Sequence, residues 1–476
     1  MDKINWLDWN KESFEKTKKE DKPILVDISA VWCYWCKRID KDTYSSKLVI
    51  DKINKNFIPI KVDTDKRPDI NVRYNLGGWP TTAILNKEGK VISGGLYLPP
   101  FDMLDFLDNA LEIFKEKKDE KIEENLFELK KFDNKDLNKI KEEILLTIEC
   151  SYDPYFGGFG NGQKFPHNSV LEFLMNLFDD KNVKTILIKT LINMADGEIF
   201  DKEEGGFYRY STQQDWSQPH YEKLLDDNAR LLKNYLLLYK LTEIEKFKEV
   251  SLKTANFILN NLLNKEKTFF YASQDADEKY NKLSLKERQK LKKPFIDTTL
   301  FLDFNCYAIQ SFFTASEILN DKKFKEIALK VLEFITKNLI NHEGVTHYYD
   351  SKARGPYLLK NHLLLINALL DSDETKYLKL AEELAEKITN NFFDKSIFYD
   401  IKRSKDNLGY LQIRKIDAEE NSLAIKVLLN LFEKTKNKKY NETIEKVVNS
   451  VKDYINPKSI FSASFAEYIF IKNQKN

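Results

Sequence analysis

A repeated pattern of helices is the feature that most limits how this chain can fold. Aliphatic helical segments follow an asparagine at five places, spaced 56 to 77 residues apart: Asn168, Asn228, Asn305, Asn361 and Asn421. Short aromatic strings such as GGFYRYS and SIFYDI lie between them, and a sixth string precedes a last helix. Stacked helix pairs of this kind form either a closed (α/α)6 toroid or an open superhelical solenoid. Six units with long loops favour the toroid.

The asparagines are expected to be N-caps or first-turn residues of the inner helices. The loop aromatics are expected to converge at one mouth of the ring. Aromatic rings with carboxylates between them are typical of sugar-binding sites. Loops that only pack over helix ends have a similar composition, so both interpretations stay open. These aromatics are Phe159, Phe207, Tyr208, Tyr210, Trp216, Tyr271, Tyr348, Tyr349, Phe398 and Tyr399.

The N-terminal third has a different pattern, in which short apolar strands alternate with helices. PILVDIS and FIPIKVD are typical of buried strands, and TTAIL and KVISGG flank a turn and predict a hairpin. The predicted order is strand, helix, strand, helix, hairpin and helix, which indicates an α/β domain.

Two of the four cysteines form a CxxC motif, Cys33-Tyr34-Trp35-Cys36, where the first strand gives way to a helix. The N-terminus of a helix stabilises a thiolate, so the pKa of Cys33 should be lowered, and Cys36 lies one turn on, within reach of a disulfide. A structural zinc site needs four ligands, but the chain has no second CxxC and no suitably spaced histidines. A redox dithiol is favoured over half a metal site or a non-catalytic remnant. Cys150 and Cys306, in helical patterns, are expected to be small core residues.

The segment ILVDISAVWCYWCK resembles the thioredoxin active site, and LGGWPTTAIL resembles its cis-proline loop. The resemblance implies that Cys33 is the attacking thiolate and Cys36 the resolving thiol. Asp27 matches the buried acid that takes a proton from the resolving cysteine, and Pro80 matches the cis-proline. A purely structural reading of Asp27 and of the tryptophans stays open. Support of the dithiol is thus assigned to Asp27, Trp32, Trp79, Pro80 and Thr81.

A closer resemblance is to the spermatogenesis-associated, thioredoxin-domain-containing family, through KVDTDKRPDI, GGWPTTAILNKEGK, GGLYLPP and, further on, GGFGNGQKFPHNSVLEFLM. Family members usually carry histidines where this chain has Tyr34 and Lys37. The family pairs a thioredoxin-like domain with a toroid similar in fold to six-hairpin glycosidases and sugar 2-epimerases, and resemblance of fold does not give their chemistry. Candidate residues for a toroid pocket are Trp216, His220, Glu222, Asp226, Asp275, Asp277 and Asp303.

These patterns predict a thioredoxin-like domain over residues 1–117, a charged linker over 118–135 and a toroid over 136–476. A net charge of +1 argues against nucleic-acid binding, and the chain shows neither a signal-like N-terminus nor a long apolar run. We therefore expect a soluble cytoplasmic protein without a metal or other cofactor.

Three functions remain open. The first is a thiol–disulfide oxidoreductase that works with a protein client and a reductase, fused to a toroid that binds a carbohydrate-like ligand. The second is a carbohydrate-active enzyme, with a carboxylate pair for a glycosidase or a histidine base for an epimerase, and a regulatory thioredoxin domain. The third is a non-enzymatic scaffold.

Overall fold

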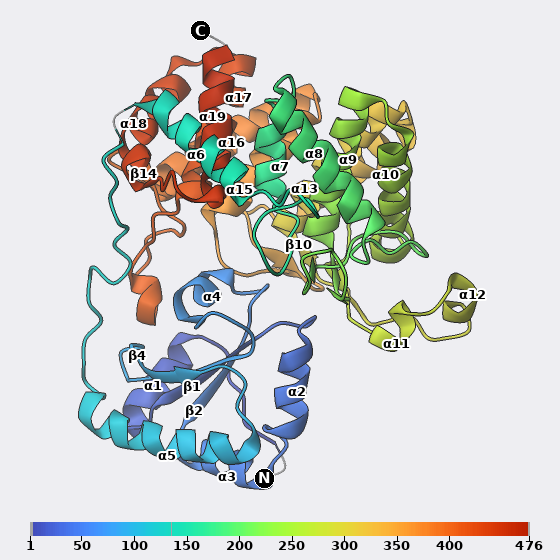
Figure 1. The fold of residues 1–476 in the computed structure, drawn as a ribbon. Coiled ribbons are helices and arrows are strands. Elements are labelled where there is room, and N and C mark those ends of the chain that lie inside the picture. The colour runs from blue at the N-terminus through green and yellow to red at the C-terminus, as the bar shows by residue number, and fades with distance from the viewer. Residues whose placement is uncertain (1–2, 135, 475–476) are drawn as a thin grey trace. The chain divides into compact units, whose positions relative to one another are not determined.

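The computed structural model describes residues 3–134 and 136–474 (Figure 1). The chain divides into two compact units, one formed by residues 1–128 with 401–415 and the other by 129–400 with 416–476. Residues 1–2, 135 and 475–476, which the predicted domain boundaries include, lie outside the described residues. Among the described residues, no helix combines the length and the apolar character needed to cross a membrane.

The first unit has a thioredoxin-like fold built on a four-stranded sheet of order β2-β1-β3-β4. β1 pairs with β2 in parallel and with β3 in the antiparallel sense, and β3 and β4 form the predicted hairpin. β1 is buried along its whole length, as its continuous apolar run indicates. The elements are α1 (Lys11–Glu20), β1 (Ile24–Ser29), α2 (Tyr34–Asp42), α3 (Lys47–Asn56), β2 (Ile58–Asp63), α4 (Pro68–Tyr74), β3 (Thr81–Leu85), β4 (Val91–Gly95) and α5 (Pro100–Lys117).

The segment 401–415, distant in sequence, packs on α4 of this unit. The Tyr410 ring stacks on Tyr74 with 4.6 Å between centroids, and the Tyr410 amide donates to the Tyr74 hydroxyl at 2.6 Å. The buried Arg73 guanidinium donates to the carbonyl oxygens of Tyr410 at 3.2 Å and Ile413 at 2.9 Å. Gly409 has φ +58°, and a Cβ there would collide with the Tyr74 hydroxyl. The contact therefore requires a glycine at this position.

Replacing Arg73 with alanine is expected to release this segment, because two carbonyl groups lose their donor. We expect the free energy of unfolding of the unit to fall by about 2 kcal/mol. Amide hydrogen exchange over residues 401–415 should accelerate in the variant. The exposed Arg38, changed to alanine, is the control. Unchanged exchange in the Arg73 variant would contradict the contact.

Over the residues that the structure describes, the second unit consists of six helical hairpins, with inner and outer helices alternating along the chain. Its outer helices are α6 (Leu137–Ser151), α8 (Lys181–Asp196), α10 (Glu245–Phe257), α14 (Lys322–Asn338), α16 (Thr375–Asn391) and α18 (Lys438–Val451). Its inner helices are α7 (Asn168–Met175), α9 (Leu225–Thr242), α13 (Leu302–Leu319), α15 (Leu359–Asp371), α17 (Ala418–Thr435) and α19 (Ala463–Gln474).

The inner helices form a closed ring. Each packs against the next, in the order α7, α9, α13, α15, α17 and α19, and α19 packs back against α7. The predicted toroid is therefore confirmed over the open solenoid. Because an outer helix intervenes between successive inner helices, the inner helices run in one direction and begin at the same end of the ring.

The repeated asparagines tie the loops to the inner helices. The Asn228 side chain accepts a hydrogen bond from the Phe207 amide at 2.6 Å and donates to the Phe207 carbonyl at 3.0 Å. The Asn305 and Phe270 pair and the Asn421 and Phe398 pair repeat this arrangement. The predicted first-turn position is confirmed, and each amide pairs with a buried loop backbone that would otherwise lack partners.

The expectation that the loop aromatics gather at one mouth is wrong for half of them. These side chains belong to the hydrophobic core of the toroid, where the Phe207 ring packs against Tyr235 of α9. The buried members are Phe159, Phe207, Tyr208, Trp216 and Phe398.

Candidate functional site

The dithiol lies at the N-terminus of α2. Cys33 is the N-cap, and the Cys36 amide donates a hydrogen bond to the Cys33 sulfur at 3.1 Å. The two cysteines form a disulfide, in which Cys33 is 5% exposed and Cys36 is 2% exposed. An amide donor and the positive end of the helix both favour a thiolate on Cys33 after reduction.

A buried carboxyl group lies on the central strand before the dithiol. Asp27 is fully buried, and burial raises its pKa to about 6, although the ammonium group of Lys61 opposes that shift. The parallel register of β1 and β2 places Lys61 beside Asp27, with 3.3 Å between the Lys61 Nζ and the Asp27 Oδ2. An acid with this pKa exchanges protons near neutral pH.

Asp40, on α2, also binds Lys61. The Lys61 Nζ donates to both carboxylate oxygens of Asp40, at 2.7 and 2.8 Å, which is closer than its approach to Asp27. Burial opposes the charge of Lys61, but the two carboxylates outweigh it and raise the pKa of the ammonium group. Asp40 therefore positions the cation and adds a negative charge near Asp27.

Replacing Asp40 with asparagine is expected to lower the pKa of Asp27, since a nearby negative charge is removed and Lys61 keeps one carboxylate partner. We expect a shift on the order of half a pH unit. Carboxyl carbon NMR of labelled Asp27 measures it. Asp42→Asn is the matched control, because Asp42 lies on the same helix and pairs with Arg38. Equal shifts in both variants would contradict the positioning role.

The loop before β3 faces the dithiol region with a cis peptide bond between Trp79 and Pro80, as predicted. The Thr81 hydroxyl donates to the Gly78 carbonyl at 2.7 Å, and the Trp79 indole donates to Asn71 at 3.1 Å. Trp32 is buried, packs edge-on against Trp79 and donates to Asp65 at 2.7 Å. These contacts link the segment before α2 to the cis-proline loop and to Asp65, and the predicted support of the dithiol by these residues stays a prediction.

Exposed apolar side chains occur within the CxxC motif and in the cis-proline loop. Tyr34 and Trp35, within the CxxC motif, are 53% and 46% exposed, and Trp35 packs on Tyr97 with 5.3 Å between ring centroids. Leu76, in the cis-proline loop, is also exposed. Apolar surface of this kind suits contact with a polypeptide client.

A cavity of about 190 Å³ lies at the centre of the toroid. All six inner helices contribute to its lining, which is dominated by charged side chains. Arg230 pairs with Glu172 at 3.1 Å, and Lys426 pairs with Glu467 at 2.6 Å. Ser169, in the first turn of α7, lies 3.3 Å from Glu419 of α17, which shows that the beginnings of the inner helices meet here.

The seven candidate residues predicted for a toroid pocket are not among the residues that line this cavity. Asp303 lies beside it, because its carboxylate is 4.0 Å from the cavity residue Lys360. Burial and then the Asp303 charge raise the pKa of Asp226, which indicates that these two acids are neighbours. Their predicted binding role stays a prediction.

The other candidates have contacts of their own. The buried Trp216 indole donates to the Phe156 carbonyl at 2.8 Å, and Asp277 caps the short helix α11 (Glu278–Asn281). His220 stacks on Tyr210 and lies 3.8 Å from Glu222, while the Asp275 amide donates to the Phe295 carbonyl at 2.8 Å. Trp216 and Asp277 therefore have structural contacts, a hydrogen bond to a loop carbonyl and a helix cap.

The two free cysteines differ in their exposure to solvent. Cys306 is buried, as predicted, but the core position predicted for Cys150 is wrong, because Cys150 lies on the exposed face of α6.

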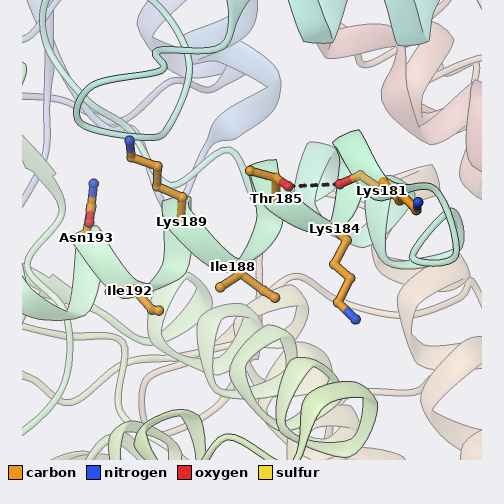
Figure 2. A pocket seen from close by; sticks show the side chains of 7 residues that line it. All are labelled: Lys181, Lys184, Thr185, Ile188, Lys189, Ile192 and Asn193. Atoms are coloured by element: carbon orange, nitrogen blue, oxygen red, sulfur yellow. Dashed lines mark hydrogen bonds between the residues drawn. The ribbon is translucent and has the colours of Figure 1, made fainter.

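A second hollow, along α8, is larger than the central cavity, at about 520 Å³, but a single helix lines it with side chains such as Lys184 and Ile188 (Figure 2). We assign no function to it.

Comparison with known proteins finds relatives of this chain. Residues 1–132 match the model of the DsbH thioredoxin-like family, described as a protein of unknown function, DUF255. An uncharacterised Caenorhabditis elegans protein is 32% identical over 309 residues, which are 58% of this chain and 41% of that protein. Spermatogenesis-associated protein 20 of Rattus norvegicus is 28% identical over 307 residues, 58% of this chain and 39% of that protein. The resemblance predicted from the sequence is confirmed. The chain spans about two fifths of the length of these relatives.

The separate units also have relatives. Thioredoxin C-3 of Corynebacterium nephridii is 28% identical over 109 residues, 22% of this chain and 71% of that protein. Cellobiose 2-epimerase of Bacillus thermoamylovorans is similar in structure, with a TM-score of 0.56 and 12% identity over 71% of this chain and 99% of that one. The family 76 α-mannanase of Bacteroides thetaiotaomicron has a TM-score of 0.51 and 12% identity over 72% of this chain and 97% of that one. At these identities, the two structures show the fold of the toroid alone.

Proposed function

We propose that the thioredoxin-like unit is a thiol–disulfide oxidoreductase. The observation that carries this proposal is the position of Cys33, at the start of α2 with the Cys36 amide on its sulfur. The buried Asp27, on the strand that precedes the dithiol, has a raised pKa and Lys61 as its partner, which suits it to exchange protons with Cys36. The similarity to a thioredoxin and the apolar rim of Tyr34 and Trp35 support the same function.

In the proposed reaction, the Cys33 thiolate attacks one sulfur of a client disulfide, and the other client sulfur leaves as a thiolate. Cys36 loses its proton to Asp27 and attacks the Cys33 sulfur, which breaks the mixed disulfide and releases the second client thiol. Two electrons pass from the dithiol to the client, and the Cys33–Cys36 disulfide forms. A dithiol reductase then restores the dithiol, which fits a cytoplasmic location.

Catalysed reduction of insulin tests this function. With dithiothreitol as the electron source, the full chain should speed precipitation of the insulin B chain over dithiothreitol alone. The aromatic rim predicts that a Tyr34→Ala, Trp35→Ala double variant acts on insulin more slowly while keeping its reactivity toward small disulfides. Absence of any acceleration by the native chain would contradict the proposal.

We also propose that the toroid binds a carbohydrate-like ligand. The specific support is the central cavity, to which all six inner helices contribute polar or charged side chains, because charged groups are costly to bury in a packed core. None of the residues that line it is a histidine, so this cavity does not favour the histidine-base epimerase alternative. Titration of the full chain with sugars, described below, tests this role.

A further inference from the structure

The central cavity combines closely paired charged groups with two groups, Lys360 and Glu420, that have no carboxylate or cation of the described residues within hydrogen-bond distance. Glu172 and Glu467 are held by Arg230 and Lys426, within hydrogen-bond distance. By contrast, the nearest carboxylate to Lys360 is that of Asp303, at the 4.0 Å limit of an ion pair. Glu420 has a buried carboxyl oxygen, Oε2, with no hydrogen-bond partner.

A buried carboxyl oxygen without a partner is costly unless a ligand or the proton state compensates for it. Burial, and then the neighbouring acids Asp417 and Asp400, raise the pKa of Glu420 well above its usual range. This shift favours the protonated carboxylic acid, which donates a hydrogen bond as well as accepting one.

The charges that line the cavity are close to balance. Four cationic side chains, Arg230, Lys233, Lys360 and Lys426, face five acidic ones, and two of the cations already have a close carboxylate partner. A ligand with a net charge would add an uncompensated charge to a partly desolvated site. A neutral ligand that both donates and accepts hydrogen bonds would add no such charge.

The size of the cavity limits the ligand further. Its volume of about 190 Å³ is below the roughly 300 Å³ at which pockets for drug-sized ligands begin. Tyr307 is the one aromatic ring in the lining, and Arg230 already lies over it, with 5.1 Å to the ring centroid. The site therefore offers hydrogen bonds and little stacking surface.

We propose that the central cavity binds a neutral polyhydroxylated molecule of about one sugar ring, with the Glu420 carboxyl group and Lys360 as its hydrogen-bond donors. This inference rests on the proposed carbohydrate-binding role of the toroid and names its ligand class. Lys360 lies in the first turn of α15 and Glu420 in the first turn of α17, so both are held by rigid elements at the end of the ring where the inner helices begin.

Isothermal titration calorimetry of the full chain tests the proposal. The neutral probes are D-glucose, D-mannose, D-galactose and myo-inositol. D-glucuronate and D-glucosamine are charged probes of the same size, and cellobiose is the larger neutral probe. We expect at least one neutral single-ring probe to bind, and the charged probes and cellobiose to bind at least about tenfold more weakly.

Variants of Glu420 separate the proposed contact from a structural role. Glu420→Gln keeps a neutral donor and should bind within about threefold of the native chain, whereas Glu420→Ala should lose about tenfold in affinity. Glu442→Ala, at an exposed position on the outer helix α18, is the control, and thermal unfolding verifies that each variant is folded.

Four results would overturn the inference: no binding of any neutral single-ring probe, equal or tighter binding of a charged probe, preferred binding of cellobiose, or unchanged affinity in Glu420→Ala. Preferred binding of a charged sugar or of cellobiose would refute this ligand class while leaving the carbohydrate-binding role in place. The insulin assay does not depend on either outcome.

Discussion

Serine in place of Cys33 is expected to abolish catalysed disulfide reduction. The Cys33 sulfur accepts a hydrogen bond from the Cys36 amide at the start of α2, and in the proposed reaction its thiolate is the nucleophile. A serine hydroxyl at that position does not attack disulfides. We expect the catalysed rate of insulin reduction to fall by at least about a hundredfold, to the rate of dithiothreitol alone.

The Cys36→Ser variant should behave differently. Cys33 keeps its position, so attack on a disulfide should continue, but the mixed disulfide should accumulate because no thiol resolves it. Mass spectrometry after reaction with oxidised glutathione detects this adduct. Cys150→Ser, at the exposed free cysteine, is the matched control and should retain full activity. An adduct on Cys36 in the Cys33 variant, with insulin reduction preserved, would reverse the assignment.

Asparagine in place of Asp27 is expected to stabilise the oxidised protein at neutral pH. The pKa of Asp27 is raised from 3.8 to about 6 in the folded chain, so the folded state binds this proton more tightly than the unfolded state. The resulting stabilisation is complete below about pH 4 and is lost as the pH rises to about 6. The shift corresponds to about 3 kcal/mol, which the variant should regain at pH 7.5.

Chemical denaturation at pH 4 and pH 7.5 measures this difference. Tryptophan fluorescence reports mainly on the thioredoxin-like unit, because five of the six tryptophans lie in it and only Trp216 lies in the toroid. The stabilisation by Asp27→Asn should be large at pH 7.5 and near zero at pH 4. The same variant should resolve mixed disulfides more slowly at neutral pH, since Cys36 loses its proton acceptor. Equal stabilisation at both pH values would show that ionisation of the buried Asp27 does not lower the free energy of unfolding.

The parts of the dithiol site that local patterns encode were predictable. Cys33 and Cys36 follow an apolar strand directly, and Pro80 precedes another strand, so short segments of sequence specify their places. Lys61 and Asp40 were missed, because their approach to Asp27 depends on the register between β1 and β2 and on where α2 packs. The one available signal was the lysine within the apolar strand FIPIKVD, where a charged side chain needs a partner.

In the toroid, too, some features could be predicted from local sequence patterns and others could not. The repeat of asparagines and aromatic strings predicted six hairpins, and the amide contacts of Asn228 explain why this spacing recurs. The cavity residues Lys360 and Glu420 were missed, because an inner helix contacts neighbours on several sides and its polar positions do not reveal which of them face the centre. The docking of 401–415 was missed as well, because this segment has no periodic pattern.

The account depends most directly on Cys33 and Cys36 being a reversible redox couple in which Cys33 reacts first. Equilibration of the full chain with glutathione buffers, followed by rapid alkylation and peptide mass spectrometry, measures both properties. We predict a reversible two-electron transition confined to this pair, with Cys33 alkylated before Cys36 in the reduced protein. A disulfide that does not exchange with glutathione or dithiothreitol, or preferential alkylation of Cys36, would contradict the account.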